Sequence, residues 1–329
     1  LSILLIDEFQ VPISEFQKQV SEALQLLEQQ TYIQRNGDFY SYLTNIEKDV
    51  ENEIKNTSIS DSEQIKLLSD IIFNEIIKTK QIRYDDNRQN YLFARKMDGS
   101  LALGQDAELA VNVVGPFHEN SGDESVIRNQ SMGKAEMLVI LPEDRDLLED
   151  LNMFLKTERY SRTSGMGQVD DAVRSILREK DDANQKRRRN LRNRVETLLQ
   201  EAKLIVSNRE LEISGDGNTR LERGFQELIR ATYSQLNMLH GHENYQETDL
   251  QKYLMEDFGD LFGGQETTLT EAEIEIQNHL RQRFARGESN HFKDLIHQFT
   301  SKPYGWPLAS VQCLLAQLFR KGRVEVRFE

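Results

Sequence analysis

Several features typical of secreted, disulfide-bonded or membrane-spanning proteins are missing from this sequence. It has 329 residues but a single cysteine, Cys313, so no disulfide can form within the chain. A lone thiol fits a reducing compartment, and we therefore expect a cytoplasmic protein. No apolar run approaches the ~20 residues that a membrane-spanning helix needs. The opening LSILLI is too short for the core of a signal peptide and has no basic leader.

Apolar residues and positive charge are also scarce. Hydrophobic residues make up 38% of the chain, charged residues 29%, and the mean hydropathy is -0.63. This composition favours several small domains joined by exposed helices over one thick enzyme core. The 55 acidic residues outnumber the 41 basic ones, which gives a net charge of -14. Because phosphate binding needs positive charge, any nucleic-acid contact would require a local basic patch.

Motifs for nucleotide chemistry are missing as well. A P-loop needs G-x-x-x-x-G-K-[ST], whereas Gly133-Lys134 is followed by alanine and has no upstream glycine at that distance. The segment SILLIDEF at 2–9 resembles a Walker B strand that ends in Asp7-Glu8. The alternative is a packing element of a small domain, which we favour because each βα unit of a nucleotide-binding sheet takes ~30 residues. We expect no catalytic residue and no cofactor-binding residue in this chain.

The histidines give no convincing metal site. His240 and His242 form an H-x-H pair that Glu247 or Asp249 could extend. Zinc signatures need further ligands at set spacings, so a helix end with solvated histidines is the simpler interpretation. We expect no metal.

Periodicity predicts a predominantly helical α+β fold with winged-helix-like modules at both ends. Residues 11–30 place Phe16, Val20 and Leu24 on one helical face, and the Asn36-Gly37 pair that follows predicts a hairpin. A helix that runs into a hairpin is typical of the back half of a winged helix. The predicted domains are a partial winged helix (1–45), a helical connector (46–80), a small α/β domain (81–165), a long helical region with a short strand (166–265) and a winged helix (266–329).

Within the middle of the chain, YLFARKM, ELAVNVVG and AEMLVIL predict strands, and residues 115–133 between the last two predict a polar loop. A helix follows at 144–160, with a buried stripe of Leu147, Leu148, Leu151, Phe154 and Leu155. The next helix, at 168–204, has almost no apolar face in REKDDANQKRRRN. Such a helix usually bridges domains or projects into solvent.

The C-terminal module has the clearest pattern. Helices are predicted at 270–286, 291–299 and 308–320, followed by a strand in which Val324, Val326 and Phe328 face inward. The helix at 308–320 takes the position of a recognition helix, with Gly322 at its C-terminal cap. Trp306 is expected in the core. The apolar face predicted for this helix consists of Leu308, Val311, Leu314, Leu315, Leu318 and Phe319.

Two basic clusters are the candidate contact residues for nucleic acid or a partner protein. They are Lys186, Arg187, Arg188, Arg189, Arg192 and Arg194 in one cluster, and Arg320, Lys321 and Arg323 in the other. The first cluster could bind phosphates, pair with acidic surface elsewhere, or only solubilise a long helix. For the second, docking to protein is favoured slightly over DNA, because the exposed face of the predicted recognition helix is only modestly basic.

Three stretches together resemble the BrxC/PglY family, the large P-loop ATPase proteins of BREX phage-defence systems. They are QRNGDFYSYLTNIEKDVENEI (34–54), AEMLVILPEDRDLLEDLNMFLKTERY (135–160) and KPYGWPLASVQCLLAQLFRKGRVEV (302–326). Their order is similar to that of the region following the ATPase domain. The resemblance implies a longer protein that binds ATP and magnesium, works with other BREX proteins and excludes phage. Because the chain starts at Leu1 and lacks the P-loop, we expect it to be a non-catalytic piece of such a protein, with DNA as an alternative ligand.

Overall fold

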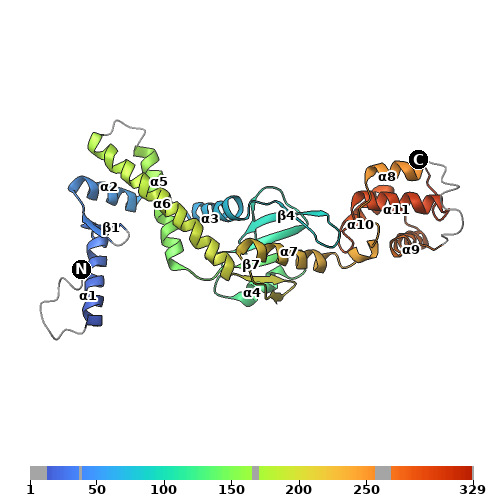
Figure 1. Ribbon diagram of the computed structural model, residues 1–329, viewed down its shortest axis with the longest axis horizontal. Helices are drawn as coiled ribbons and strands as arrows, with labels where there is room; N and C mark the ends of the chain where they lie inside the picture. Colours follow the sequence, from blue (N-terminus) through green and yellow to red (C-terminus); the bar gives the residue numbers. More distant parts are fainter. Residues whose placement is uncertain (1–12, 37–38, 165–169, 256–267, 328–329) are drawn as a thin grey trace. The chain divides into compact units, whose positions relative to one another are not determined.

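The computed structural model describes residues 13–36, 39–164, 170–255 and 268–327 of the chain, which folds into two compact units. Unit 1 comprises Leu1–Glu75 and Glu143–Glu196, and unit 2 comprises Ile76–Pro142 and Thr197–Glu329. Helices make up most of unit 1, whereas unit 2 combines helices with the large sheet (Figure 1). The predicted α+β, predominantly helical fold class is confirmed. The Walker B-like segment 2–9 lies outside the described residues.

Unit 1 begins with the predicted helix and hairpin. Helix α1 (Ile13–Gln29) leads into strands β1 (Ile33–Asn36) and β2 (Phe39–Tyr42), which pair antiparallel. None of the residues of α1 is buried, so its apolar stripe packs only partly. The helix and the hairpin are therefore confirmed, whereas the winged-helix interpretation of residues 1–45 stays a prediction.

The next helices of unit 1 begin at local sequence signals. At α2 (Asn45–Asn56) a capping box joins the side chains of Thr44 and Glu47 to each other's backbone N–H groups. The sequence offers Ser60 or Asp61 as the cap of helix α3 (Asp61–Asp70), and Ser60 occupies that position. The helix continues into a π-helix, η2 (Ile71–Ile77), which crosses from unit 1 into unit 2.

Two long helices complete unit 1. Helix α5 (Arg145–Ser164) packs on α2 and α3 and buries Leu147, Leu151 and Phe154 of the predicted stripe. Helix α6 (Asp171–Glu201) has almost no apolar face in its middle, as the sequence indicates, and it runs from unit 1 into unit 2, yet its middle is also packed. Lys180 and Asn184 are buried there, and the Asn184 side chain donates to the Phe154 carbonyl at 3.0 Å. Polar side chains with partners can thus occupy core positions that a hydrophobicity pattern does not reveal.

The sheet of unit 2 contains all three strands predicted between residues 81 and 141. Its order is β3 (Gln81–Arg83), β4 (Asn90–Met97), β6 (Leu109–Val114), β7 (Glu136–Ile140), β8 (Lys203–Val206) and β9 (Arg209–Leu211), and β5 (Ser100–Leu103) also pairs with β4. Strands β4, β6 and β7 run parallel, and the other pairs are antiparallel. Because β8 and β9 join this sheet, it extends beyond the range 81–165 predicted for the α/β domain.

Helices cover both faces of this sheet (Figure 1). On one face, Ile127 of α4 (Glu124–Ser131) packs into a cluster with Val114, Leu138 and Ile205. On the other face, Phe225 of α7 (Gly217–Thr232) lies with its ring centre 5.1 Å from that of Phe93. Burial on both sides explains why every residue of β6 is apolar except Asn112.

Helix α4 corrects the sequence interpretation of residues 115–133 as a loop throughout. The Asp123 carboxylate caps it by accepting the backbone N–H groups of Ser125 and Val126 at 3.1 and 3.2 Å. Only Ile127 is buried, so this short helix carries too little periodic apolar signal to be recognised by pattern alone.

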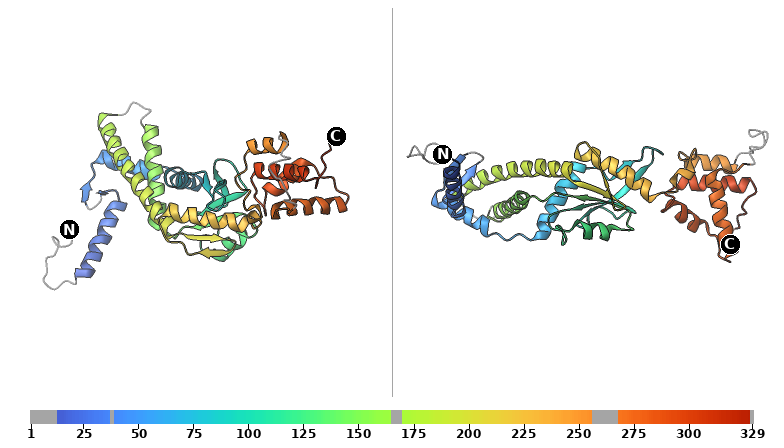
Figure 2. Two further views of the ribbon diagram at one scale, coloured as in Figure 1. Left: turned by 45° about the vertical axis from the view of Figure 1, so that its right-hand side comes forward. Right: turned by 90° about the horizontal axis from the view of Figure 1, so that it is seen from below.

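The C-terminal part of unit 2 is a cluster of short helices (Figure 2). It contains the 3₁₀ turn η3 (Leu236–Leu239), α8 (Glu247–Met255), α9 (Glu271–Ala285), α10 (Phe292–Thr300) and α11 (Leu308–Arg320). Helix α11 packs on α8, α9 and α10. Trp306 is buried as expected, stacked on Phe299 with ring centres 5.0 Å apart, and its indole N–H donates to the Gln235 carbonyl.

Details at the end of this cluster differ from the prediction. Helix α11 buries Val311, Leu314 and Leu318, but Leu308 and Phe319 are exposed. Residues 324–327 form no strand, and Val326 is exposed, so the predicted inward strand face is wrong for the described residues; Phe328 lies outside them. A strand requires a hydrogen-bonding neighbour, and none of the described residues pairs with this segment. Gly322 adopts the expected left-handed conformation, with φ of 65°.

Within the described ranges, no helix is both long and apolar enough to cross a bilayer.

Candidate functional site

The nine cations that the sequence singles out do not form one surface. Six lie on α6 within unit 1, and three follow one another closely at the end of α11 in unit 2. The two clusters belong to different units of the chain.

Arg188 is the most constrained member of the α6 cluster. Its guanidinium donates to Asp70 at 3.0 Å and also to Glu75, so it joins α6 to the end of α3 and to η2. The same guanidinium lies over the Phe154 ring of α5, 5.5 Å from its centre. These contacts make Arg188 a structural link between α6 and three other elements, with little of its charge left for a ligand.

Arg194 pairs with two acids at the start of α5. Its Nε lies 2.6 Å from Asp144, and its Nη2 lies 2.9 Å from Asp146. Burial acts to raise the pKa of Asp144, but the hydrogen bond and charge of Arg194, together with hydrogen bonds from the backbone N–H groups of Leu147 and Asp146, outweigh it and lower that pKa below its ordinary value. Arg187 and Arg192 have longer ion pairs, at 3.6 Å to Asp150 and 4.0 Å to Glu196. The acids of unit 1 thus account for four members of the cluster.

Lys186 and Arg189 differ from their neighbours. Both are exposed, and neither side chain forms a hydrogen bond or an ion pair with another residue in the described part of the chain. Within this cluster of six, they are the cations whose charge is available to a partner.

Lys321, in the second cluster, forms an ion pair within the C-terminal module. Its ammonium lies 2.7 and 2.8 Å from the two carboxylate oxygens of Glu273, whose side chain is fully buried. Arg320 donates to the Tyr253 carbonyl at 3.3 Å. Arg323 is exposed, and only its backbone N–H is bonded, to the Leu318 carbonyl. The basic end of the predicted recognition helix is thus partly used in holding the module together.

The histidine pair does not gather metal ligands. His240 is almost fully exposed, with its Nδ1 3.5 Å from Glu243, while His242 stacks on Tyr245. Burial lowers the pKa of His242, which favours its neutral form. Among the described residues, no three potential ligands lie close enough to hold a metal ion.

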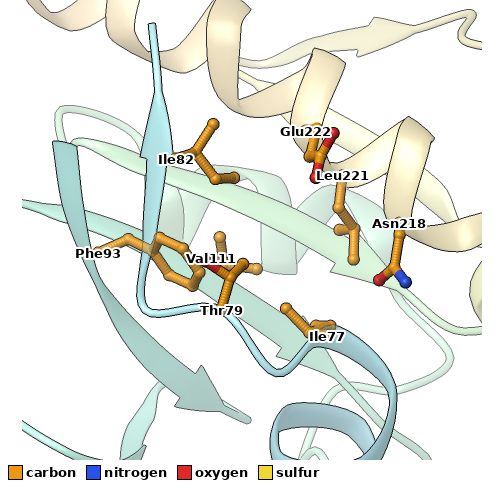
Figure 3. Close-up of a pocket in the computed structure, with 8 residues that line it drawn as sticks. All are labelled: Ile77, Thr79, Ile82, Phe93, Val111, Asn218, Leu221 and Glu222. Atoms are coloured by element: carbon orange, nitrogen blue, oxygen red, sulfur yellow. The ribbon is translucent and has the colours of Figure 1, made fainter. Parts of the chain in front are cut away.

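One partly enclosed cavity among the described residues is too small for a nucleotide or a substrate. It lies in unit 2 between the sheet and α7, is lined mainly by Ile77, Ile82, Phe93, Val111 and Leu221, and has a volume of about 20 Å³ (Figure 3). That is room for one water molecule. A larger groove of about 780 Å³ runs along β9 and α7, but it is open, and arginines and glutamates line it together. Neither has the chemistry of a phosphate-binding loop.

The charged residues that the sequence analysis missed are buried. Arg220 of α7 donates to the backbone carbonyls of Leu199, Gln200 and Ala202 at the end of α6, and to that of Ile213. Lys180 of α6 pairs with Glu51 of α2. Nothing in the local sequence marks these two residues. Glu273, by contrast, completes the pattern T-x-x-E with Thr270, which signals a capping box.

Comparison with protein families gives two matches that together span most of the chain. Residues 57–228 match the model described as "BREX ATP-binding protein BrxC 4th domain with six-stranded beta sheet". Residues 235–329 match "BREX ATP-binding protein BrxC winged helix-turn-helix domain". The six-strand path from β3 to β9 agrees with the first description, and α9, α10 and α11 agree with the second. No solved structure matches the chain.

Proposed function

Because this chain belongs to the BrxC family of BREX ATP-binding proteins, we propose that it is a non-catalytic interaction region that couples an ATPase domain to partner proteins. The ATP and magnesium sites would lie in that ATPase domain, the partners would be other BREX proteins, and the complex would act in the cytoplasm against phage. The described part of the chain supports this role with interaction modules and with cavities unsuited to a nucleotide.

One observation favours protein contacts over DNA contacts for the basic clusters on α6 and at the end of α11. Arg188, Arg194 and Lys321 are held by carboxylates of their own unit. A cation already paired with a carboxylate gains little from a phosphate, because it must give up one anion to bind another. Direct binding of DNA by α6 and α11 remains the alternative.

On α6, we propose that Lys186 and Arg189 are the contact residues. Their exposed, unshared charge suits an acidic partner surface, and losing it would leave the ion pairs of unit 1 intact. The double variant Lys186→Glu/Arg189→Glu in the intact ATPase protein should weaken its association with the other purified BREX proteins at least tenfold, by isothermal calorimetry. Lys66→Glu is the matched control, because Lys66 is also exposed in unit 1 but lies on α3.

A second measurement tests the coupling. Hydrogen exchange of this region in the intact protein should differ between the ADP-bound state and the state with a non-hydrolysable ATP analogue. Identical exchange in the two states would contradict the coupling, and turnover of ATP by the 329-residue chain alone would contradict its non-catalytic role.

A further inference from the structure

Basic residues gather in one stretch of the C-terminal module, in contrast to the rest of the chain. Residues 281–294 contain 4 Lys and Arg and 2 Asp and Glu, a balance of 4 − 2 = +2, whereas the whole chain carries -14. A polyanion is therefore attracted more strongly to this stretch than to the acidic chain as a whole.

These residues form the corner where α9 ends and α10 begins. Arg283 organises that corner. The side chain of Arg283 lies 3.3 Å from Glu288 and 3.8 Å from Asp294, and it donates to the Ser289 carbonyl at 2.8 Å. The Asn290 amide donates to the Leu280 carbonyl at 3.3 Å across the same turn. These bonds give the corner a defined shape, and the single charge of Arg283 offsets part of the charge of the two nearby acids.

The remaining charged groups of the corner are basic and available. Arg281, Arg286 and Lys293 are exposed, and their side chains make no hydrogen bond or ion pair with other residues of the described ranges. Arg281 also lies one helical turn before Phe284, so the two side chains project from the same side of α9.

Two exposed aromatic rings stand among these cations. The residue Phe284 is 80% exposed and Phe292 is 54% exposed, although both belong to helices whose other faces are packed. Burying a phenylalanine side chain fully is worth about 1.5–3 kcal/mol, so these rings could contribute to the binding of a ligand that covers them. A surface that interleaves aromatic rings with cations is typical of proteins that bind single strands, because bases stack on the rings while phosphates meet the cations.

We propose that the α9–α10 corner binds single-stranded nucleic acid, with Phe284 and Phe292 as stacking platforms and Arg281, Arg286 and Lys293 as phosphate contacts. A duplex would use the cations but not the rings, because its bases are already stacked. This surface is separate from the end of α11 and from α6, and it adds a ligand to the protein-coupling role proposed above.

Fluorescence anisotropy of the 329-residue chain with labelled oligo(dT) of about 20 nucleotides tests the proposal. At ~50 mM salt the strand should bind more tightly than a duplex of equal length, and added salt should weaken it steeply. Phe284→Ala should weaken binding roughly five- to a hundredfold, as expected for one stacked base. Phe284→Trp should retain binding, and Phe284→Leu should not, although all three substitutions lie at an exposed position.

The triple variant Arg281→Ala/Arg286→Ala/Lys293→Ala should lower the slope of log affinity against log salt by about 2, since each single-strand phosphate contributes about 0.7. Lys66→Ala/Lys80→Ala, at two exposed lysines outside the C-terminal module and outside α6, is the control and should leave strand binding unchanged. An absence of oligo(dT) binding at ~50 mM salt would overturn the proposal. So would equal binding by Phe284→Ala, or duplex binding as tight as strand binding, because either result removes the role of the rings.

Discussion

Lys321 and Glu273 form a two-pronged ion pair that joins the end of α11 to the first turn of α9. The ammonium lies 2.7 and 2.8 Å from the carboxylate oxygens, and one of those oxygens also accepts the Thr270 backbone N–H at 2.9 Å. The side chain of Glu273 is fully buried, so its charge depends on Lys321 for compensation. A lysine that the sequence places among candidate ligand contacts is thus a structural residue of the winged-helix module.

Lys321→Ala should destabilise the module by about 3 kcal/mol, because it leaves a buried carboxylate without its counter-charge. Thermal unfolding followed by circular dichroism measures this loss. Adding Glu273→Gln to Lys321→Ala should restore part of the stability, since the buried group is then neutral. Arg323→Ala, at an exposed neighbouring position, should change stability by less than about 0.5 kcal/mol. Equal effects of Lys321→Ala and Arg323→Ala would contradict the structural role.

Arg188 and Arg189 are sequence neighbours that should behave oppositely. Arg188→Ala removes the pairs with Asp70 and Glu75 and the contact with the Phe154 ring, and we expect it to cost about 2 kcal/mol. Arg189→Ala removes an exposed side chain and should stay within about 0.5 kcal/mol of the parent chain. Urea unfolding of both variants measures the difference, and a larger effect at Arg189 would show that α6 packs in another rotation.

Arg220→Lys should fail to replace arginine. The guanidinium reaches four backbone carbonyls, three of them in or just after the last turn of α6, where the negative end of the helix dipole favours a cation. A lysine has three donors on one nitrogen and cannot match this planar spread. Both Arg220→Lys and Arg220→Ala should therefore increase hydrogen exchange at residues 198–201. Normal protection in Arg220→Lys would mean that charge alone suffices.

Glu136 predicts a dependence of stability on pH. It lies buried on β7, where burial raises the pKa of its carboxyl, although Lys134, Lys96 and Asn112 act in the opposite direction. The folded state therefore binds the proton more tightly than the unfolded state, and this group's contribution to stability falls as the pH rises through the raised pKa. Glu136→Gln should raise the melting temperature at pH ~7 and lose that advantage below pH ~4, where the carboxyl is protonated in both states. A gain that is the same at both pH values would show that ionisation is not its cause.

The elements of the fold could be predicted wherever the local chain carries the signal. Periodicity predicts three strands, which end before Asp98-Gly99 or lie at 109–114 and 136–140. Capping and turn preferences predict the cap at Ser60 and the left-handed conformation of Gly322. Helix α4 was not predicted, because it buries one apolar residue and so has little periodic signal. The strand at 324–328 was predicted from alternation alone, but a strand also needs a hydrogen-bonding neighbour, and residues 324–327 form none.

Site residues were harder to predict for a physical reason. A run such as KRRRNLRNR shows how much charge is present but not where the opposing acids lie. Asp70, Glu75, Asp144 and Asp146 are separated from it by tens of residues in the sequence and meet it only through packing. The exposed cations near Phe284 were not predicted as contacts, because Glu288 and Asp294 follow them in the sequence and make the segment look mixed in charge. In the fold, Arg283 pairs with both acids.

The amino-acid sequence by itself determined most of the secondary structure, the helical α+β class and the family, because these depend on local periodicity, turn residues and recurring sequence motifs. Only the tertiary structure decided which charges hold the fold and which remain available to a ligand. That division follows from distance: an ion pair depends on separations of a few ångströms between side chains, and these are set by the packing of helices far apart in the chain. Lys321 is an example. The sequence shows a lysine in a basic run at the end of a helix, and the tertiary structure shows that its ammonium is bound to the buried Glu273.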